Sequence, residues 1–154
     1  MATDGVLGDG VKVAYSASSP VSWTQVTQVL NAEIPTFETE RVDTTVHGTT
    51  GFKSSMPGLT EVGDLTITLL ADLDELTSAT HEAMFSYNVS KTTLWWAVEI
   101  PTNRAKTRYK MWEFQGNIGS VSPGAPIEDK QTLDVQVRFE GTTFNRHPAG
   151  ATQL

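Results

Sequence analysis

The feature that most constrains this chain is a strict alternation of apolar and polar residues near its C-terminal end. The apolar set is Leu133, Val135, Val137 and Phe139, and the polar set is Asp134, Gln136, Arg138 and Glu140. Because successive side chains of a β-strand point to opposite faces, this pattern predicts a strand with one face in the core and one in solvent. Such half-buried strands are typical of antiparallel sheets.

Similar patterns recur along the chain, and Thr and Val, at 22 and 14 residues, both favour strands. Further strands are predicted at Val11–Tyr15, Trp23–Leu30, Phe37–Val46, Asp64–Leu69, Leu94–Ile100 and Trp112–Ile118. Residues 74–88 change to a helical period, with apolar positions at Leu76, Ala79, Ala83 and Tyr87. The expected fold is mainly β: an antiparallel β-sandwich or partly closed barrel with one flanking helix.

The length of 154 residues favours a single domain. We expect an N-terminal arm over residues 1–22, a β-sandwich domain over 23–145 and a C-terminal tail over 146–154. Inside the domain, residues 47–59 carry several Gly and Pro residues and no periodicity. This segment is longer than most hairpin loops of about 2–5 residues, and long loops in compact domains are often functional.

The charge of the chain is unevenly distributed. Its formal net charge is −7, with −9 in residues 1–90 and +2 in residues 91–154. An acidic protein is poorly suited to binding nucleic acid, which requires Lys and Arg to neutralise phosphates. One segment is strongly basic, with Arg104, Lys106, Arg108 and Lys110. It is either a solvated hairpin or a basic edge that meets an acidic edge of the next copy in a ring.

The residue types that usually form metal-binding or catalytic sites are not grouped in this sequence. There is no Cys, and His47, His81 and His147 are scattered over a loop, a helix and the tail. We therefore expect no metal site, no cofactor and no enzymatic activity, and we expect His81 on the helix surface. The first 25 residues contain Asp4 and Asp9 and lack the apolar segment of a signal peptide, and the longest apolar run has five residues. We expect synthesis and assembly in the cytoplasm.

A series of local patterns carries a family resemblance. These are Glu40–Thr45, the Pro-Gly-Leu turn and strand in Met56–Leu69, the helix in Asp72–Tyr87, the linker Ser120–Lys130 and the last strand Leu133–Gly141. In this order and spacing they resemble the major tail tube proteins of long-tailed phages, over about two thirds of the chain. The segment Ile100–Arg108, which contains the basic residues, and the N-terminal arm depart from the family pattern. Contractile-tail tubes and type VI secretion inner tubes share the same fold.

The resemblance implies a structural protein. Six copies would close into a ring, and rings would stack into a virion tail tube that holds the tape measure protein and later passes double-stranded DNA. Tail terminator and tail-tip proteins would be further partners. The polar strand face would line the channel, with candidates Asp64, Thr66, Thr68, Asp134, Gln136, Arg138 and Glu140. The long loop would reach the neighbouring ring, with candidates His47, Phe52, Lys53 and Met56.

Two alternatives stay open at this stage. Phe52 either anchors the long loop on a neighbouring copy or folds back onto its own core. The chain is alternatively a monomeric β-sandwich binding module, for instance a carbohydrate-binding virion decoration protein, which requires an exposed aromatic platform. Trp96 and Trp112 fall on apolar strand faces and are expected in the core, so Trp95 is the candidate for that platform.

Overall fold

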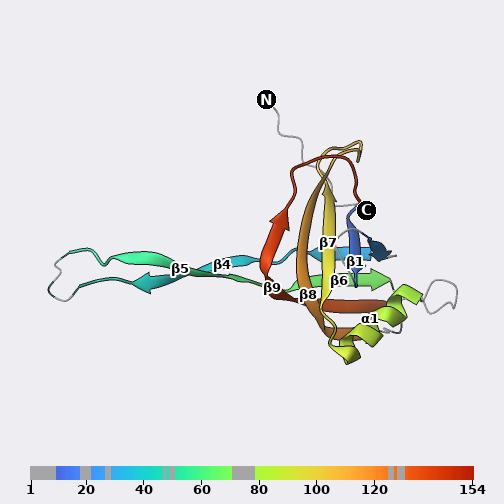
Figure 1. Cartoon of the computed structure of the whole chain (residues 1–154), viewed down its shortest axis with the longest axis horizontal. Coiled ribbons are helices and arrows are strands. Elements are labelled where there is room, and N and C mark those ends of the chain that lie inside the picture. Colours follow the sequence, from blue (N-terminus) through green and yellow to red (C-terminus); the bar gives the residue numbers. More distant parts are fainter. Residues whose placement is uncertain are drawn as a thin grey trace.

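The computed structural model of the chain describes residues 10–17, 22–26, 29–46, 48, 51–70, 79–124, 127 and 131–154. These residues form nine strands and one helix (Figure 1). The elements are β1 (Lys12–Ser16), β2 (Thr24–Val26), β3 (Val29–Glu33), β4 (Phe37–Asp43), β5 (Ser55–Val62), β6 (Leu65–Leu70), α1 (Ala79–Ser90), β7 (Leu94–Pro101), β8 (Tyr109–Gly124) and β9 (Thr132–Arg146). Seven strands form one antiparallel sheet, and β4 and β5 form a separate ribbon.

The seven-stranded sheet folds onto itself through two long strands. Its order is β2-β1-β7-β8-β9-β6-β3, and β8 and β9 contain 16 and 15 residues. The first half of β8 pairs with β7 and with the end of β9, whereas its second half pairs with the start of β9. The β8–β9 register shifts twice, near Gly116 and near Gly119. Because such bulges bend strands, β7 and the first half of β8 cross over β6 and the start of β9 (Figure 1).

Gly116 allows the two long strands to approach closely at this bend. A Cβ atom at Gly116 would lie 2.6 Å from the carbonyl oxygen of Arg138 and 2.9 Å from Cγ1 of Val137. Both distances are shorter than real side chains tolerate, and the first involves backbone that cannot rotate away. The position therefore requires glycine for steric reasons.

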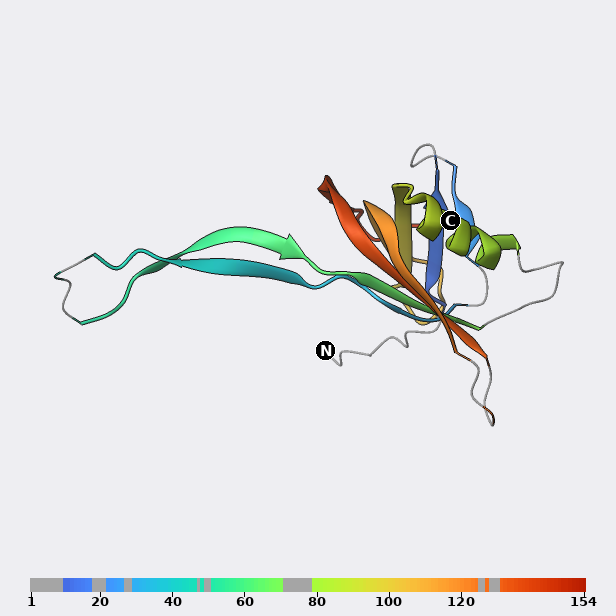
Figure 2. The same ribbon diagram turned by 90° about the horizontal axis from the view of Figure 1, so that it is seen from below.

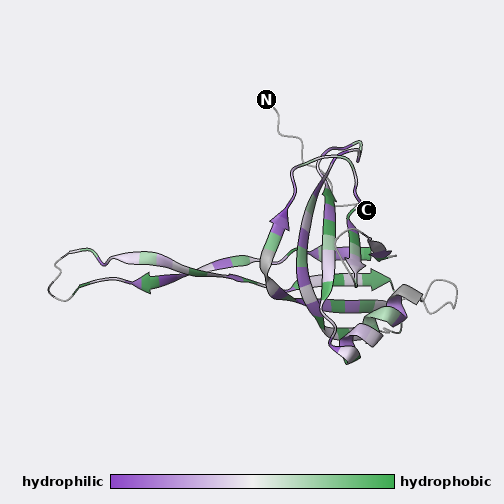
Figure 3. Cartoon of the chain, viewed as in Figure 1, coloured by the Kyte–Doolittle hydropathy of each residue, from purple (hydrophilic) through white to green (hydrophobic). Residues whose placement is uncertain are grey.

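The apolar faces of the two halves of the sheet meet in one core, and the strands alternate between hydrophobic and hydrophilic residues along their length (Figure 3). Core residues that are at most 3% exposed are Val13, Leu65, Ile67, Leu69, Leu94, Trp96, Val98, Phe114, Leu133, Val135 and Val137. The buried indole N–H of Trp96 donates a hydrogen bond to the carbonyl of Gly116 (3.2 Å). The predicted fold class, a mainly antiparallel β structure with a flanking helix, is confirmed.

The helix α1 packs against β8 and closes one side of the core. Met84 is 1% exposed, and the ring of Tyr87 contacts Tyr15 edge-on, with centroids 5.8 Å apart. The Asn88 amide donates to the carbonyl of Ile118 (3.0 Å). His81, which we expected on the surface, is 4% exposed, so this prediction is wrong. The expected helix 74–88 begins outside the described residues, and the described part ends at Ser90.

Three predicted segments are organised differently in the structure. The expected strand Trp23–Leu30 is two strands, β2 and β3, which occupy opposite ends of the sheet order. The expected loop 47–59 overlaps β5, which begins at Ser55. Within the range 1–22 that was expected as an arm, β1 pairs with β7 inside the sheet, and Val13 is fully buried.

Residues 147–154, here called the C-terminal strap, continue past β9 and lie against the outer face of the sheet. The His147 N–H donates to the carbonyl of Met111 (2.9 Å). Gly150 and Tyr109 exchange two backbone hydrogen bonds of 2.7 and 3.0 Å. The strap therefore continues the pairing of β9 with β8 beyond Arg146, the last residue of β9.

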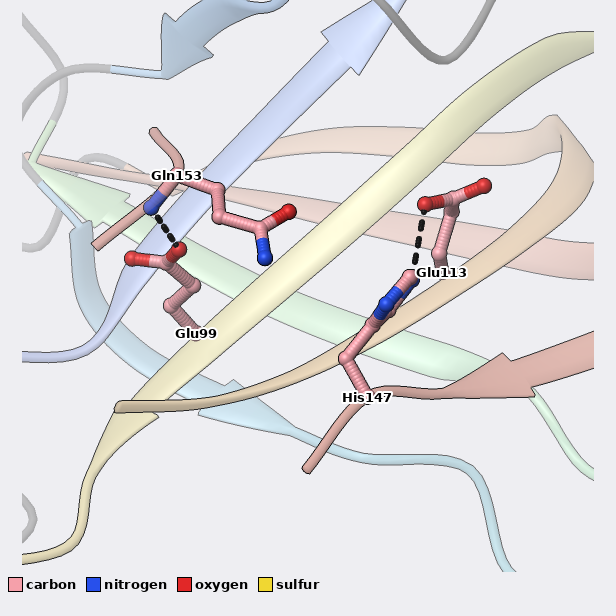
Figure 4. A network of polar contacts seen from close by, with 4 residues as sticks. All are labelled: Glu99, Glu113, His147 and Gln153. Atoms are coloured by element: carbon pink, nitrogen blue, oxygen red, sulfur yellow. Dashed lines mark hydrogen bonds and ion pairs between the residues drawn. The ribbon is translucent and has the colours of Figure 1, made fainter. Parts of the chain in front are cut away.

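Two buried carboxylates hold this strap (Figure 4). Glu99 is 1% exposed and accepts hydrogen bonds from the Gln153 N–H (2.6 Å) and from Oγ1 of Thr152 (2.8 Å). Glu113 is 6% exposed, and its Oε2 lies 3.1 Å from Nε2 of His147. A buried carboxylate is stable only when hydrogen-bond donors reach it. The strap supplies such donors to Glu99 and Glu113.

Candidate assembly surfaces

The ribbon of β4 and β5 projects from the body of the molecule, and we call residues 37–62 the arm (Figures 1 and 2). Every residue of β4 is exposed, as is every residue of β5 except Val62. From Phe37 to Val46 a strand spans about 30 Å, at about 3.3 Å per residue. A two-stranded hairpin on its own is only marginally stable in water.

The two faces of the arm differ in chemistry. On one face, Glu38 lies directly opposite Glu61 and Val42 directly opposite Met56. Glu40 shares this face by the alternation of β4. On the other face, the hydroxyls of Thr39 and Thr60 are 2.9 Å apart, and Arg41 NH1 lies 3.4 Å from the Ser55 hydroxyl. One face is therefore acidic and partly apolar, whereas the other carries hydroxyl groups together with Arg41 and Asp43, whose charges cancel.

The root of the arm is fixed to the body by aromatic contacts. The ring of Phe37 meets the ring of Phe144 edge-on, with centroids 4.9 Å apart. Phe144 in turn stacks on the buried Phe114, with centroids 5.1 Å apart and ring planes 9° apart. Phe37 is 46% exposed, so about half of this side chain is buried against its own chain. The direction in which the arm leaves the body is therefore set by packing.

Hydrogen bonds order the described part of the arm beyond β4. The Thr44 N–H donates to the Ser54 carbonyl (3.0 Å), and the Thr45 N–H donates to Oδ1 of Asp43 (2.8 Å). Hydrogen bonds from Thr45 lower the pKa of the Asp43 carboxyl below its usual value. These local bonds keep the arm extended without contacts from the body.

The predicted inter-ring residues lie along this arm. Phe52 is 96% exposed, so the alternative in which it folds back onto its own core is wrong. Lys53 is exposed, and Met56, in β5, is 54% exposed. His47 lies outside the described residues. Val46 and Leu59, at 71% and 81% exposed, add further apolar surface that sequence reasoning did not single out.

The seven predicted channel residues lie on strands β6 and β9 and the turn before β6. Thr66 pairs with Gln136 and Thr68 with Asp134, so the four side chains share one face of the sheet. The Gln136 amide donates to Oδ2 of Asp64 (2.7 Å). We call this surface the polar face. At its margin, Glu140 accepts a hydrogen bond from the hydroxyl of Thr93 (2.8 Å).

The structure adds residues of β3 and β8 to the polar face. Glu33 pairs with Thr66 and Asn31 with Thr68, and Ser120 pairs with Gln136 on the other side. A Cβ atom at Gly119 would lie 2.8 Å from Nε of Arg138, so the Arg138 side chain lies across this glycine. The charged residues of the face are Glu33, Asp64, Asp134, Glu140 and Arg138, a net charge of −3. Sequence reasoning missed β3 because Trp23–Leu30 reads as one strand.

The basic segment forms the turn between β7 and β8, and we call residues 102–108 the basic turn. The Asn103 side chain organises it by accepting from the N–H groups of Thr107 (3.0 Å) and Arg108 (3.2 Å). The side chains of Arg104, Lys106 and Arg108 are exposed. Lys110 lies instead in β8, where its ammonium group is 5.6 Å from the ring centroid of Trp112. The structure thus brings three of the four predicted bases together on one turn.

The described residues also bear on metal binding, membrane spanning and the predicted aromatic platform. They contain no group of three His, Asp or Glu side chains that could hold a metal ion. None of the helical structure in these residues has the length and apolar character needed to cross a membrane. Trp95 and Trp112 are half-buried, whereas Trp96 is fully buried. The predicted core position of Trp96 is confirmed, whereas that of Trp112 is wrong, because Trp112 lies outside the buried core.

By sequence, the chain matches no known family profile and no curated protein. By structure, it is similar to a chain in the tail of an empty gene transfer agent particle, with a TM-score of 0.66, 12% identity, and coverage of 96% of this chain and 99% of that one. The SPP1 tail tube protein has a TM-score of 0.64 and 12% identity, and the match covers 93% of this chain and 80% of that one. A chain of the anti-feeding prophage tube cap has a TM-score of 0.70 and 13% identity, and the match covers 96% of this chain and 95% of that one. The chain has the tail-tube fold.

The tail-tube fold confirms the resemblance that the ordered sequence patterns indicate. The match extends over nearly the whole chain, so it includes the arm and the strap as well as the sheet. At 11–13% identity, few side chains are shared with these tail tube structures. The likeness is therefore one of backbone fold.

Proposed function

We propose that this chain is the structural subunit of a tail tube, forming stacked hexameric rings whose channel holds a tape measure protein and conducts double-stranded DNA. In this proposal the chain has no catalytic role. Its partners are other copies of itself, the tape measure protein, and terminator and tip proteins at the ends of the tube. It would be assembled in the host cytoplasm and function in the virion tail.

The exposed arm is the observation that carries this proposal. A two-stranded ribbon with both faces in solvent gains little from its own chain, and Val46, Phe52 and Leu59 on it are more than 70% exposed. Burial of such side chains on a neighbouring copy would stabilise both the arm and the assembly.

The polar face supports the proposed channel wall. With a net charge of −3 on each copy, a ring would present a negative inner surface to DNA. Phosphates are repelled by such a surface, so DNA would slide without binding. The hydroxyl and amide groups of Thr66, Thr68 and Gln136 would hydrogen-bond water along the channel surface.

The structural neighbours support the proposed symmetry and partners. One is from a gene transfer agent tail with C6 symmetry, one is the SPP1 tail tube, and one is from a tube-terminating cap. These are properties of those proteins. Their agreement with the arm and the polar face favours a hexameric tube over the carbohydrate-binding alternative, which depends on the half-buried Trp95.

Electron microscopy of the concentrated, purified protein, with a light-scattering mass of the same sample, tests the proposal. Six-fold rings or hollow tubes are expected, with a mass at or above six times that of the 16.8 kDa subunit. A glycan-binding screen of the same sample serves as the comparison. Saturable glycan binding that is lost in Trp95→Ala, by a protein that stays monomeric, would favour the binding module instead.

A further inference from the structure

We infer that the acidic face of the arm binds the basic turn of a second copy of this chain. This inference rests on the proposed function, because it names the surface of the neighbouring copy that the arm contacts. The acidic residues are Glu38, Glu40 and Glu61, and the basic residues are Arg104, Lys106 and Arg108.

The acidic face carries charge that its own ribbon does not neutralise. Glu38 and Glu61 are directly opposite in the antiparallel ladder, where like charges are destabilising. Neither carboxylate forms an ion pair with another described residue. Beside them lies a hollow of about 270 Å³, lined by Thr36, Glu38, Glu61, Val62 and Gly63. A cationic side chain that enters this hollow would relieve the repulsion between the two carboxylates.

The same face also offers apolar area for a contact. Val42 and Met56 form a cross-strand pair further along the arm and are 47% and 54% exposed. An apolar centre next to charged groups is the usual composition of a protein interface. The arm therefore combines charges that select a partner with apolar surface that gains from its burial.

The basic turn is a suitable partner because its backbone is fixed. Besides the two hydrogen bonds to Oδ1 of Asn103, the Thr102 N–H donates to the Arg108 carbonyl (2.8 Å). The turn also holds Lys106 at a φ of 55°. The Arg108 guanidinium also donates to the carbonyl of Ala149 (3.2 Å). A loop whose backbone is already fixed loses less entropy on binding.

The two surfaces cannot meet within one copy. The arm leaves the body sideways, whereas the basic turn lies at the far end of β7 and β8, on another side of the body (Figures 1 and 2). Complementary surfaces at different places on one molecule produce head-to-tail contacts, which close into rings or continue as filaments. Such a contact between copies would account for the uneven charge of the chain, which is −9 in residues 1–90 and +2 in residues 91–154.

A charge-swap experiment tests this inference. One variant carries Glu38→Lys and Glu61→Lys, and a second carries Arg104→Glu and Lys106→Glu. Each presents like charges at the proposed contact, so each alone is expected to raise the assembly threshold concentration at least tenfold. When mixed in equal amounts, every contact between unlike variants is again attractive, and the threshold should return to within about threefold of the wild type. A single chain with all four changes should assemble similarly.

Several controls make the outcomes distinct. Glu82→Lys, an exposed reversal on α1, should leave the threshold unchanged. The melting temperature of each variant is measured beside its assembly threshold, so that a loss of folding is distinguished from a loss of the contact. Equal thresholds for wild type and both reversed variants, or no rescue on mixing, would overturn the inference while leaving the tube proposal intact. A wild-type chain that stays monomeric would overturn both.

Discussion

Phe52 provides the sharpest test of the role of the arm. At 96% exposed it makes almost no contact within its own chain, so Phe52→Ser should change the free energy of unfolding of the monomer by less than about 0.5 kcal/mol. If the arm docks on a neighbouring copy, the same side chain becomes buried, which is worth about 1.5–3 kcal/mol. The dissociation constant of each contact should therefore rise roughly 10- to 150-fold.

Phe37 is the matched control on the same arm. It is 46% exposed and contacts Phe144, so Phe37→Ala should lower the free energy of unfolding by about 1–2 kcal/mol. Sedimentation velocity over a concentration series measures assembly, and chemical denaturation in dilute solution measures monomer stability. A Phe52→Ser protein that assembles at the wild-type threshold, or that loses as much monomer stability as Phe37→Ala, would refute the reasoning.

Four further outcomes follow from the structure. Thr152→Val removes a donor to the buried carboxylate of Glu99 and should cost about 1.5 kcal/mol of stability by denaturation. Gly116→Ala places a Cβ atom against the β9 backbone and should cost at least about 2 kcal/mol. Burial raises the pKa of the Tyr15 hydroxyl above its ordinary value of 10.0. The stability that the protonated hydroxyl contributes is present below pH 10.0 and is lost as the pH rises through the pKa of the folded state. Tyr15→Phe should therefore flatten the fall in stability at high pH. Asp134→Lys should leave the melting temperature within about 2 °C yet impair DNA passage in an infection assay; normal infectivity would remove Asp134 from the channel wall.

The strands that face the core from one side could be predicted from the sequence. In β6 and β9, residues such as Ile67 and Val135 alternate strictly with polar neighbours, because each strand has one face in the core and one in solvent. The two strands between Trp23 and Glu33 could not be separated, since the short run contains no Gly or Pro at the point of division. Their separation depends on which distant strand each one pairs with, and local propensity does not encode that choice.

The arm and the strap show where sequence reasoning fails for other reasons. Pro57 and Gly58 are typical of loops, yet they lie in β5, where a shift in register beside Arg41 accommodates them. The strap follows no periodicity because hydrogen bonds to Glu99 and Glu113 hold it. His81 lies off the predicted apolar face of the helix, which contains Ala79, Ala83 and Tyr87, and yet it is buried. The polar face, by contrast, was predictable because alternation determines it.

A three-dimensional reconstruction of the assembled protein tests the central claim most directly. The account predicts six-fold rings stacked into a hollow tube, with the polar face toward the channel and each arm seated on a neighbouring copy. Density in which the arms project freely into solvent, or in which the face containing Thr66 and Gln136 points outward, would contradict it.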